Sequence, residues 1–380
     1  MKFIHLSDLH IGKRLDSQSF YEDQKYILSE ILSIIRDQRP DAVIIAGDVY
    51  DKAVPSAEAV ELFDSFITEL SKEDLQLFVI SGNHDSPERI AFGARIMSGA
   101  GVHFSPVYDG HVEPVYMEDS FGKLAVYMLP FVKPANVKNV TGDENIKTYT
   151  EAVVKAITEM NVDEGIRNVL VTHQFVAGAV TSASEEATVG GTDCVDAGIF
   201  DAFDYVALGH LHGPQNVGRE TLRYCGTPLK YSFQEKNQEK SVTVVEMNEK
   251  GNTAVSTIPL APLRDLREIR GNFDRLMMRI SYEGTNTDDY IRAILTDERD
   301  VPDAMQRLRT VYKNILLLDY DNARTRKNTE IDLSGTASEK KSETDLLGEL
   351  FEQNNGRKMT EIQKQTAEEI FESLREGKQQ

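Results

Sequence analysis

The sequence predicts an α/β protein built around a largely buried sheet, and two observations support this. Short apolar runs recur through the first half of the chain. They are rich in Val, Ile, Leu and Phe and lack the strict alternation of a half-exposed strand. Stretches with apolar residues at helical spacing lie between several of these runs. Strands and helices that follow one another in this way are typical of a sheet covered by helices.

The first 262 residues contain most of the predicted elements. Helices are expected at residues 24–36 and 57–70, the second of which begins after Pro55 with the N-cap type Ser56. Residues 176–196 are rich in Gly, Ser and Thr and predict a loop near the site. Strands are expected at residues 2–6, 42–46, 75–80, 121–131, 168–171, 205–208, 241–247 and 253–258.

The pattern changes after Pro262 and predicts a small α+β domain over residues 263–325. Its expected helices are residues 273–282 and 302–312, and its expected strands are residues 290–295 and 315–320. Residues 326–342 are charged, lack apolar periodicity and predict a linker. Residues 343–380 predict two amphipathic helices, at 344–352 and 360–374. We favour a partner protein over the parent domain as the surface that covers their apolar stripes.

Composition and charge narrow the possible functions. The formal net charge of −20 argues against a protein that coats DNA through a basic surface. An enzyme that reaches phosphates through bound cations remains compatible with this charge. Cys194 and Cys225 lie far apart and form no C-x-x-C pair, so we expect no disulfide, no zinc knuckle and a cytoplasmic location.

Metal-ligand residue types follow five of the predicted strands. The motifs are DLHIG, GDVYD, GNHD, TH and GHLH, and each begins where an apolar run stops. The carboxyl ends of strands in α/β sheets converge on the binding crevice, so these side chains should meet at one edge. The predicted ligands are Asp8, His10, Asp48, Asn83, His173, His210 and His212.

Seven donors are too many for one tetrahedral ion and fit two ions that share a carboxylate. We expect Asp48 to bridge the ions, because its strand is the most central in the pattern. Imidazole and oxygen donors without thiolate favour manganese, iron or zinc over magnesium or calcium. A single Asp in such a place is more often a helix N-cap, and a single His is more often a satisfied polar residue. Capping alone does not explain all five motifs in this order.

These motifs resemble the signature set of the calcineurin-like metallophosphoesterases. Longer stretches, among them THQFVAG and YCGTPLKYSF, resemble the nuclease subunits of bacterial double-strand-break repair complexes within that superfamily. The resemblance covers almost the whole chain. It implies a layered α/β/β/α sandwich with a capping domain, and two manganese ions at one edge.

The resemblance also implies roles for single residues. One ion would be held by Asp8, His10, Asp48 and His212, and the other by Asp48, Asn83, His173 and His210. His84 would be the catalytic histidine and Asp85 its orienting partner. Some relatives carry a histidine where this chain has Asp51, which puts in doubt a substrate contact there but not the metal site.

A nuclease of this kind needs surfaces for DNA and for partners. The resemblance implies 3′–5′ exonuclease and single-strand or hairpin endonuclease activity. It further implies a homodimer through residues 57–70 and 88–97, DNA contacts by the capping domain, and an SMC-like ATPase bound by the tail helices. The residues that follow the motifs suggest a basic rim that contacts DNA, namely Lys13, Arg14, Lys52 and Arg89.

Two other functions remain open at this point. A small-molecule or protein phosphoesterase of the same superfamily would use the same metal site, but would have no use for the capping domain and tail helices. Protein phosphatases of the superfamily also carry Arg-Gly where this chain has Lys52-Ala53. A non-catalytic scaffold would be expected to have lost one or more ligands, and all seven are present here.

Overall fold

The computed structural model describes residues 1–15, 18–181, 193–326, 347–348, 351 and 358–376. The described chain forms two compact units. The first contains Met1–Arg270, Asp274–Ala293 and Asp303–Leu318. The second contains Gly271–Phe273, Ile294–Pro302 and Asp319–Gln380. The division therefore runs through the residues predicted to form the capping domain, and the predicted domain boundaries stay a prediction.

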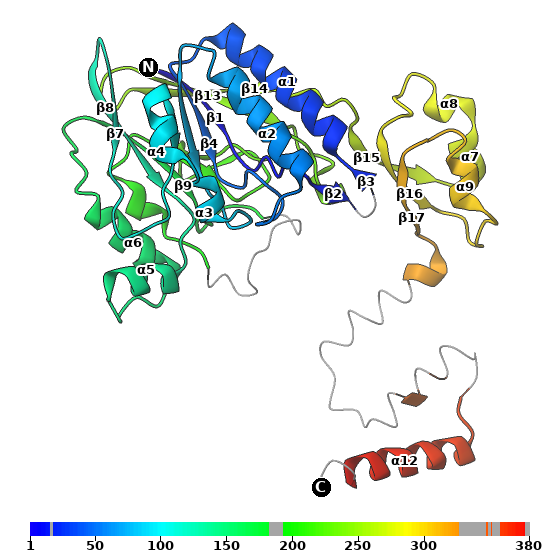
Figure 1. Ribbon diagram of the computed structural model, residues 1–380. Helices are drawn as coiled ribbons and strands as arrows, with labels where there is room; N and C mark the ends of the chain where they lie inside the picture. The colour runs from blue at the N-terminus through cyan, green and yellow to red at the C-terminus, as the bar shows by residue number, and fades with distance from the viewer. Residues whose placement is uncertain (16–17, 182–192, 327–346, 349–350, 352–357, 377–380) are drawn as a thin grey trace. The chain divides into compact units, whose positions relative to one another are not determined.

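Two six-stranded sheets form the body of the first unit (Figure 1). The first sheet has the order β14 (Thr253–Pro259), β13 (Ser241–Met247), β1 (Lys2–Leu6), β4 (Ala42–Ala46), β5 (Gln76–Ile80) and β6 (Val102–Phe104). The strands from β1 to β6 in this order run parallel, and β13 pairs antiparallel with β1 and β14. The expected strands of this sheet are confirmed to within one residue, and β6 was not predicted.

The second sheet has the order β11 (Gln215–Val217), β12 (Arg219–Tyr224), β10 (Tyr205–Gly209), β9 (Arg167–His173), β8 (Gly122–Leu129) and β7 (Val115–Asp119). Its four central strands are parallel and its two edge strands pair antiparallel with their neighbours. β8, β9 and β10 were predicted, whereas β7, β11 and β12 were not. The motif-bearing strands thus belong to two sheets, not to the single sheet edge that the sequence pattern suggested.

The two sheets pack face to face and helices cover their outer faces. The layer between the sheets includes Phe3, Ile44 and Phe78 from the first and Val126 and Val171 from the second. Helices α1 (Tyr21–Gln38) and α2 (Ala57–Leu70) cover the first sheet, and α5 (Pro134–Thr141) and α6 (Tyr149–Glu159) cover the second. Hydrophobic burial on both faces of each sheet stabilises the four layers. The expected α/β/β/α sandwich is confirmed.

Several predicted helices are interrupted or shortened. Residues 88–97 form two short helices, α3 (Pro87–Ile90) and α4 (Ala94–Met97), because Gly93 adopts a positive φ of 76° between them. Residues 273–282 likewise form α7 (Phe273–Met277) and α8 (Arg279–Tyr282). The helix expected at 302–312 is reduced to α9 (Ala304–Leu308). The three 3-10 helices found among the described residues are η1 (Ser98–Ala100), η2 (Ala197–Phe200) and η3 (Phe233–Glu235).

The remaining strands form two small sheets. β15 (Leu266–Gly271), β16 (Tyr290–Leu295) and β17 (Ile315–Tyr320) form a three-stranded sheet, in which only β15 was not predicted. β2 (Arg14–Leu15) pairs with β3 (Gln18–Ser19) just after the first motif.

Helix α12 (Glu361–Glu376) confirms the second tail helix. Almost all of the predicted linker and most of the first tail helix lie outside the described residues. Among the residues that the structure describes, no helix has both the length and the hydrophobicity needed to span a bilayer. Neither Cys194 nor Cys225 forms a disulfide, as expected.

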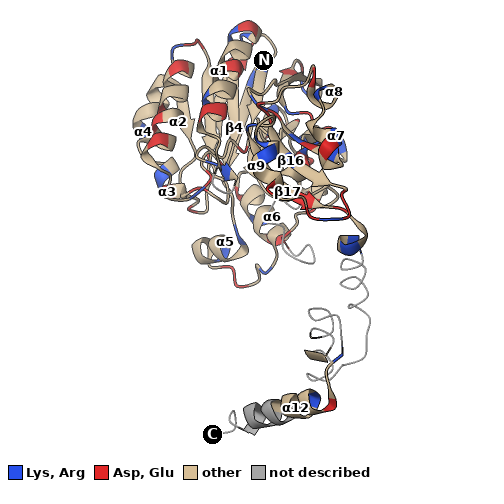
Figure 2. Cartoon of the chain, turned by 90° about the vertical axis from the view of Figure 1, so that its right-hand side faces the viewer, with Lys and Arg blue, Asp and Glu red and all other residues tan. Residues whose placement is uncertain are grey.

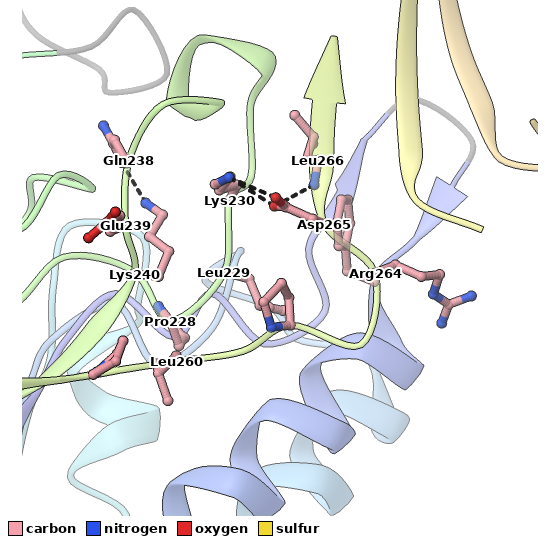
Figure 3. A pocket seen from close by; sticks show the side chains of 13 residues that line it. Pro228, Leu229, Lys230, Gln238, Glu239, Lys240, Leu260, Arg264, Asp265 and Leu266 are labelled. Carbon is pink, nitrogen blue, oxygen red and sulfur yellow. Dashed lines mark hydrogen bonds and ion pairs between the residues drawn. The ribbon is translucent and has the colours of Figure 1, made fainter. Parts of the chain in front are cut away.

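The segment that leaves β14 lines an open pocket of about 320 Å³, whose side chains Figure 3 shows. Three cations line it, and a carboxylate pairs with each. Lys230 Nζ lies 2.9 Å from Asp265 and Arg264 Nε lies 2.9 Å from Asp23. Lys240 Nζ lies 2.7 Å from Glu235. Glu235 in turn contacts His212, one of the predicted metal ligands.

Candidate metal centre

Six of the seven predicted ligands lie on tight loops that follow parallel strands of the two sheets, and His173 is the last residue of β9. Asp8 and His10 follow β1, Asp48 follows β4, and Asn83 follows β5. Four of the seven adopt a positive φ, namely Asp8 (52°), His10 (43°), Asp48 (48°) and His210 (105°). Non-glycine residues rarely adopt this conformation, and it is concentrated at functional sites where the surrounding structure enforces it.

Asp48 lies between donors of the two sheets. Its Oδ2 is 3.3 Å from His173 Nε2 and 3.7 Å from His10 Nε2. Asp8, Asp48 and His173 each offer one ligand atom within 4.8 Å of the others. His10, Asp48 and His84 do the same. A carboxylate shared by two such groups has the position of a bridging ligand.

Asn83 joins the histidines of the second sheet. Its Oδ1 lies 3.0 Å from His173 Nε2 and 2.9 Å from His210 Nδ1. On the other side of Asp48, the rings of His10 and His212 are 5.1 Å apart. The structure thus brings all seven predicted donors into one cluster.

Glycines allow the loops to approach this closely. A Cβ on Gly82 would lie 2.1 Å from Asp48 Oδ1, and a Cβ on Gly209 would lie 1.9 Å from the carbonyl oxygen of Ala46. Real Cβ atoms do not approach other atoms this closely. A side chain at Gly82 would therefore push the second and third motif loops apart, and one at Gly209 would push β10 away from β4 of the other sheet.

Burial and mutual charge shift the pKa values of the cluster. Burial, with Asp48 nearby, raises the pKa of Asp8 to about 6. Burial, with His173 nearby, lowers the pKa of His210 to about 3. Burial would lower the pKa of His173, but the Asp48 carboxylate raises it to about 9. Buried carboxylates that repel one another require positive charge, which a cation supplies.

His10 provides a further test of whether a cation fits. Its side chain is 1% exposed, and neither ring nitrogen has a hydrogen-bond partner among the described residues. An imidazole buried without a partner is costly unless something else binds it. The burial of His10 beside Asp48 is therefore what we expect of a residue that binds a metal ion.

Hydrogen bonds outside the cluster fix two of the imidazoles. His173 Nδ1–H donates to the carbonyl of Ala46 at 2.8 Å, which directs Nε2 towards Asp48. His212 Nδ1–H donates to Glu235 Oε1 at 3.0 Å. Metal-binding histidines commonly donate their second ring N–H to a carbonyl or carboxylate in this way.

Glu235 is a buried residue that the sequence motifs did not reveal. It lies at the end of η3 and is fully buried, and its Oε2 accepts a hydrogen bond of 2.7 Å from Lys240. Burial would raise the pKa of Glu235, but His212 and Lys240 lower it to about 2. Glu235 is therefore ionised at neutral pH. Nothing in its position 23 residues after His212 marked it in the sequence.

The expectation that Asp85 orients His84 is wrong. Asp85 accepts hydrogen bonds from the backbone N–H groups of Val49, Tyr50 and Gly82, at 2.9–3.0 Å, and so holds the second and third motif loops together. His84 Nδ1 instead lies 3.2 Å from the carbonyl oxygen of Asp51. The His84 ring is 4.9 Å from that of His10, at the edge of the cluster.

The four basic residues predicted to contact DNA have different surroundings. Lys13 Nζ lies 2.7 Å from Asp51, which offsets its charge. Arg14 and Lys52 line one cavity of about 350 Å³ beside the first two motif loops. Arg89 lies exposed on α3. Figure 2 shows acidic residues along α1 and α2, so a positive rim would be a local feature.

Comparison with known families agrees with this geometry. The model of the calcineurin-like phosphoesterases matches residues 1–214, more than half of the chain. The model described as the type 5 capsule protein repressor C-terminal domain matches residues 262–355. A Staphylococcus epidermidis protein, named as the SbcD subunit of the nuclease SbcCD, is 33% identical over 87% of this chain and 89% of its own. This chain belongs to the calcineurin-like phosphoesterases.

Further comparisons place the chain within that family. The protein of the same name from Staphylococcus saprophyticus is 31% identical over 99% of both chains. The chain is thus a calcineurin-like phosphoesterase of the SbcD group, which confirms the resemblance seen in the sequence. A dimetal phosphatase from Danio rerio covers 69% of this chain and 98% of its own at 9% identity, and its TM-score of 0.39 is too low to support an inference.

Proposed function

We propose that this chain is a manganese-dependent DNA nuclease that hydrolyses phosphodiester bonds with two metal ions. It would act as a 3′–5′ exonuclease and as an endonuclease on single-stranded and hairpin DNA. The convergence of seven donors from two sheets around Asp48 is the observation that carries the proposal. The similarity to proteins named as the SbcD subunit of the nuclease SbcCD supports DNA as the substrate.

We assign one ion to Asp8, His10, Asp48 and His212, and the other to Asp48, Asn83, His173 and His210. Two divalent cations held there would lower the pKa of a shared water and stabilise the charge that builds up on the scissile phosphate. Ala46 and Glu235 hold His173 and His212 in the tautomer that directs Nε2 inwards. Imidazole, carboxylate and amide donors without thiolate are compatible with manganese, iron or zinc, and we propose manganese on the resemblance to the nuclease subunits.

His84 is the residue that we propose donates a proton to the leaving 3′ oxygen. Its Nδ1 contacts the carbonyl oxygen of Asp51, which requires a proton on Nδ1 in the neutral ring. Protonation of Nε2 then gives an imidazolium that can release a proton towards the substrate, and histidine is suited to this near neutral pH. The geometry of the cluster also admits His84 as a metal ligand, and the substitution described in the Discussion separates the two roles.

Exposed apolar residues on α2, around α3 and α4, and on α12 indicate surfaces that bind partner chains. Val60 on α2, Phe92 and Ile96 are 45%, 82% and 85% exposed. Figures 1 and 2 show α2, α3 and α4 side by side, and we propose that they form a homodimer interface. Ile362 on α12 is 79% exposed and supports a helix that binds the ATPase subunit implied by the SbcCD name.

A nuclease assay tests the proposal. The purified chain is incubated with blunt and hairpin DNA labelled at either end, with manganese, with magnesium or with EDTA. Each reaction is run with and without the ATPase subunit. We expect manganese-dependent products that shorten from the 3′ end and an opened hairpin. Hydrolysis of a nitrophenyl diester without any DNA cleavage would instead favour a small-molecule phosphoesterase. Absence of bound transition metal after manganese supplementation would favour a scaffold.

A further inference from the structure

A second pocket opens beside the metal centre and has aromatic walls. It measures about 200 Å³, and the rings of Phe131, Tyr149 and Phe175 line it. Asn83 and His210, two of the proposed metal ligands, line the same pocket. Pockets for drug-sized ligands measure roughly 300–1,000 Å³, so this smaller one fits a single ring system.

The three aromatic side chains come from separate segments and are all half-buried. Phe131 follows β8, Tyr149 begins α6, and Phe175 follows β9. The Phe131 ring is stacked on that of His210, with an interplanar angle of 16° at 6.4 Å, and lies 6.4 Å from that of Tyr149. Aromatic rings that keep part of their surface exposed beside a catalytic centre can accept another ring.

Two charged side chains, Asp193 and Lys133, limit which chemical groups the pocket can accept. The Asp193 carboxylate lines the pocket, and its negative charge would repel a phosphate group that entered. Lys133 lies exposed at the rim, with Nζ 5.9 Å from the centre of the Phe131 ring. An uncharged ring therefore fits inside, while a backbone phosphate fits outside next to Lys133.

We infer that this pocket binds one unpaired nucleobase of the nucleotide adjacent to the scissile phosphate. The inference rests on the proposed nuclease function, because Asn83 and His210 place the pocket directly beside the reacting phosphate. Every base has a π-face, so stacking here tolerates any sequence. A base must leave the duplex stack to enter, which favours frayed ends, hairpin loops and single strands over paired DNA.

Tyr149 is the best residue to test. It is not one of the proposed metal ligands, and the capping box of Thr148 and Glu151 holds the start of α6 without it. Tyr149→Ala removes the ring, and Tyr149→Phe retains it. The substrates are a single-stranded oligonucleotide and the same strand with an abasic site at the nucleotide next to the cleaved bond. Manganese binding, followed by electron paramagnetic resonance, should be the same in all three proteins.

We expect the native chain and Tyr149→Phe to lose about tenfold in kcat/KM when the base is missing, mainly through KM. Tyr149→Ala should show a much smaller difference between the two substrates. An equal penalty for the missing base in native protein and Tyr149→Ala would overturn the inference, because the two changes would then act independently.

A binding measurement separates this inference from the proposed function. A 2-aminopurine placed at the same nucleotide should change its fluorescence when native protein is mixed with the strand, before any cleavage. The change should be lost in Tyr149→Ala and kept in Tyr149→Phe. A protein that cleaves no DNA but gives this signal would contradict the nuclease proposal alone. An absent signal in the native protein would contradict the pocket alone.

Discussion

His84 lies at the edge of the metal centre and is the one histidine of the third motif. One ring nitrogen contacts the carbonyl oxygen of Asp51, 3.2 Å away. We propose that the other nitrogen acts on the substrate. If it acts as a proton donor, its loss should affect the reaction much more than binding.

His84→Gln should therefore bind manganese and DNA as the native chain does and lose most cleavage, by about 100-fold or more in kcat. Manganese titration, DNA binding by fluorescence anisotropy and single-turnover cleavage measure the three properties. His103→Gln, at a histidine of β6 away from the centre, is the matched control. Lost manganese binding in His84→Gln would identify His84 as a ligand, and normal cleavage would remove it from the mechanism.

We expect Glu235 to act on the reaction through His212. Its carboxylate accepts the His212 Nδ1–H, and Lys240 keeps it ionised and in place. Loss of such an outer partner typically lowers metal affinity by about 10–100-fold. Glu235→Gln keeps the shape and removes the charge, so manganese affinity should fall by about this factor, as isothermal titration calorimetry would measure.

Glu246→Gln, an exposed side chain of β13, is the control and should leave manganese affinity unchanged. Unchanged affinity in Glu235→Gln would show that the His212 orientation does not depend on Glu235.

At the scale of elements, the sequence located the strands well and several helices less well. Parallel strands buried on both faces, such as β4 and β10, consist of uninterrupted apolar runs, so their limits are visible in the sequence. The edge strands β7 and β11 are partly exposed and contain no long apolar run, so the pattern used to find the buried strands did not reveal them. The break at Gly93 was missed because the apolar spacing continues across it.

The candidate site was predictable to a similar degree. Its donors lie at strand ends that are marked by Gly, Asp and His, so these residue types at the ends of apolar runs pointed to them. Glu235 and Tyr149 reach the centre only through the folding of distant segments, and local sequence carries no signal for such contacts.

The split between α3 and α4 exposes the apolar residues proposed to form a dimer interface. Phe92→Asp with Ile96→Asp would place four carboxylates in a two-fold interface and should raise the dimer dissociation constant at least tenfold. Light scattering after size exclusion measures this across a concentration series. Ile280→Asp is a matched control, because Ile280 is 83% exposed on α8. A native chain that is monomeric throughout the series would remove these helices as an interface.

At the scale of the whole molecule, the proposed ions connect the two sheets. Asp48 and Asn83 follow strands of the first sheet, whereas His173 ends β9 and His210 follows β10 of the second. A ligand that binds only the folded chain stabilises it in proportion to the logarithm of its concentration. Bound metal should therefore hold the two sheets together and increase the stability of the folded chain.

Manganese added to the EDTA-treated chain should raise the free energy of unfolding by about 2.7 kcal/mol at one hundred times its dissociation constant. Thermal unfolding followed by circular dichroism measures the shift in midpoint. His173→Ala should lose most of the shift, whereas His103→Ala should retain it. A midpoint that manganese leaves unchanged in the native chain would mean that no ion bridges the sheets.

Four of the proposed ligands have left-handed backbone, and His210, at a φ of 105°, lies farthest from what a side chain tolerates. Glycine at that position would relieve the local strain while deleting a donor. Laboratory selection for heat resistance alone would thus favour substitutions that remove the proposed metal-binding side chains, so stability would rise while activity is lost. A screen for variants of higher thermal stability should therefore also measure the rate of DNA cleavage.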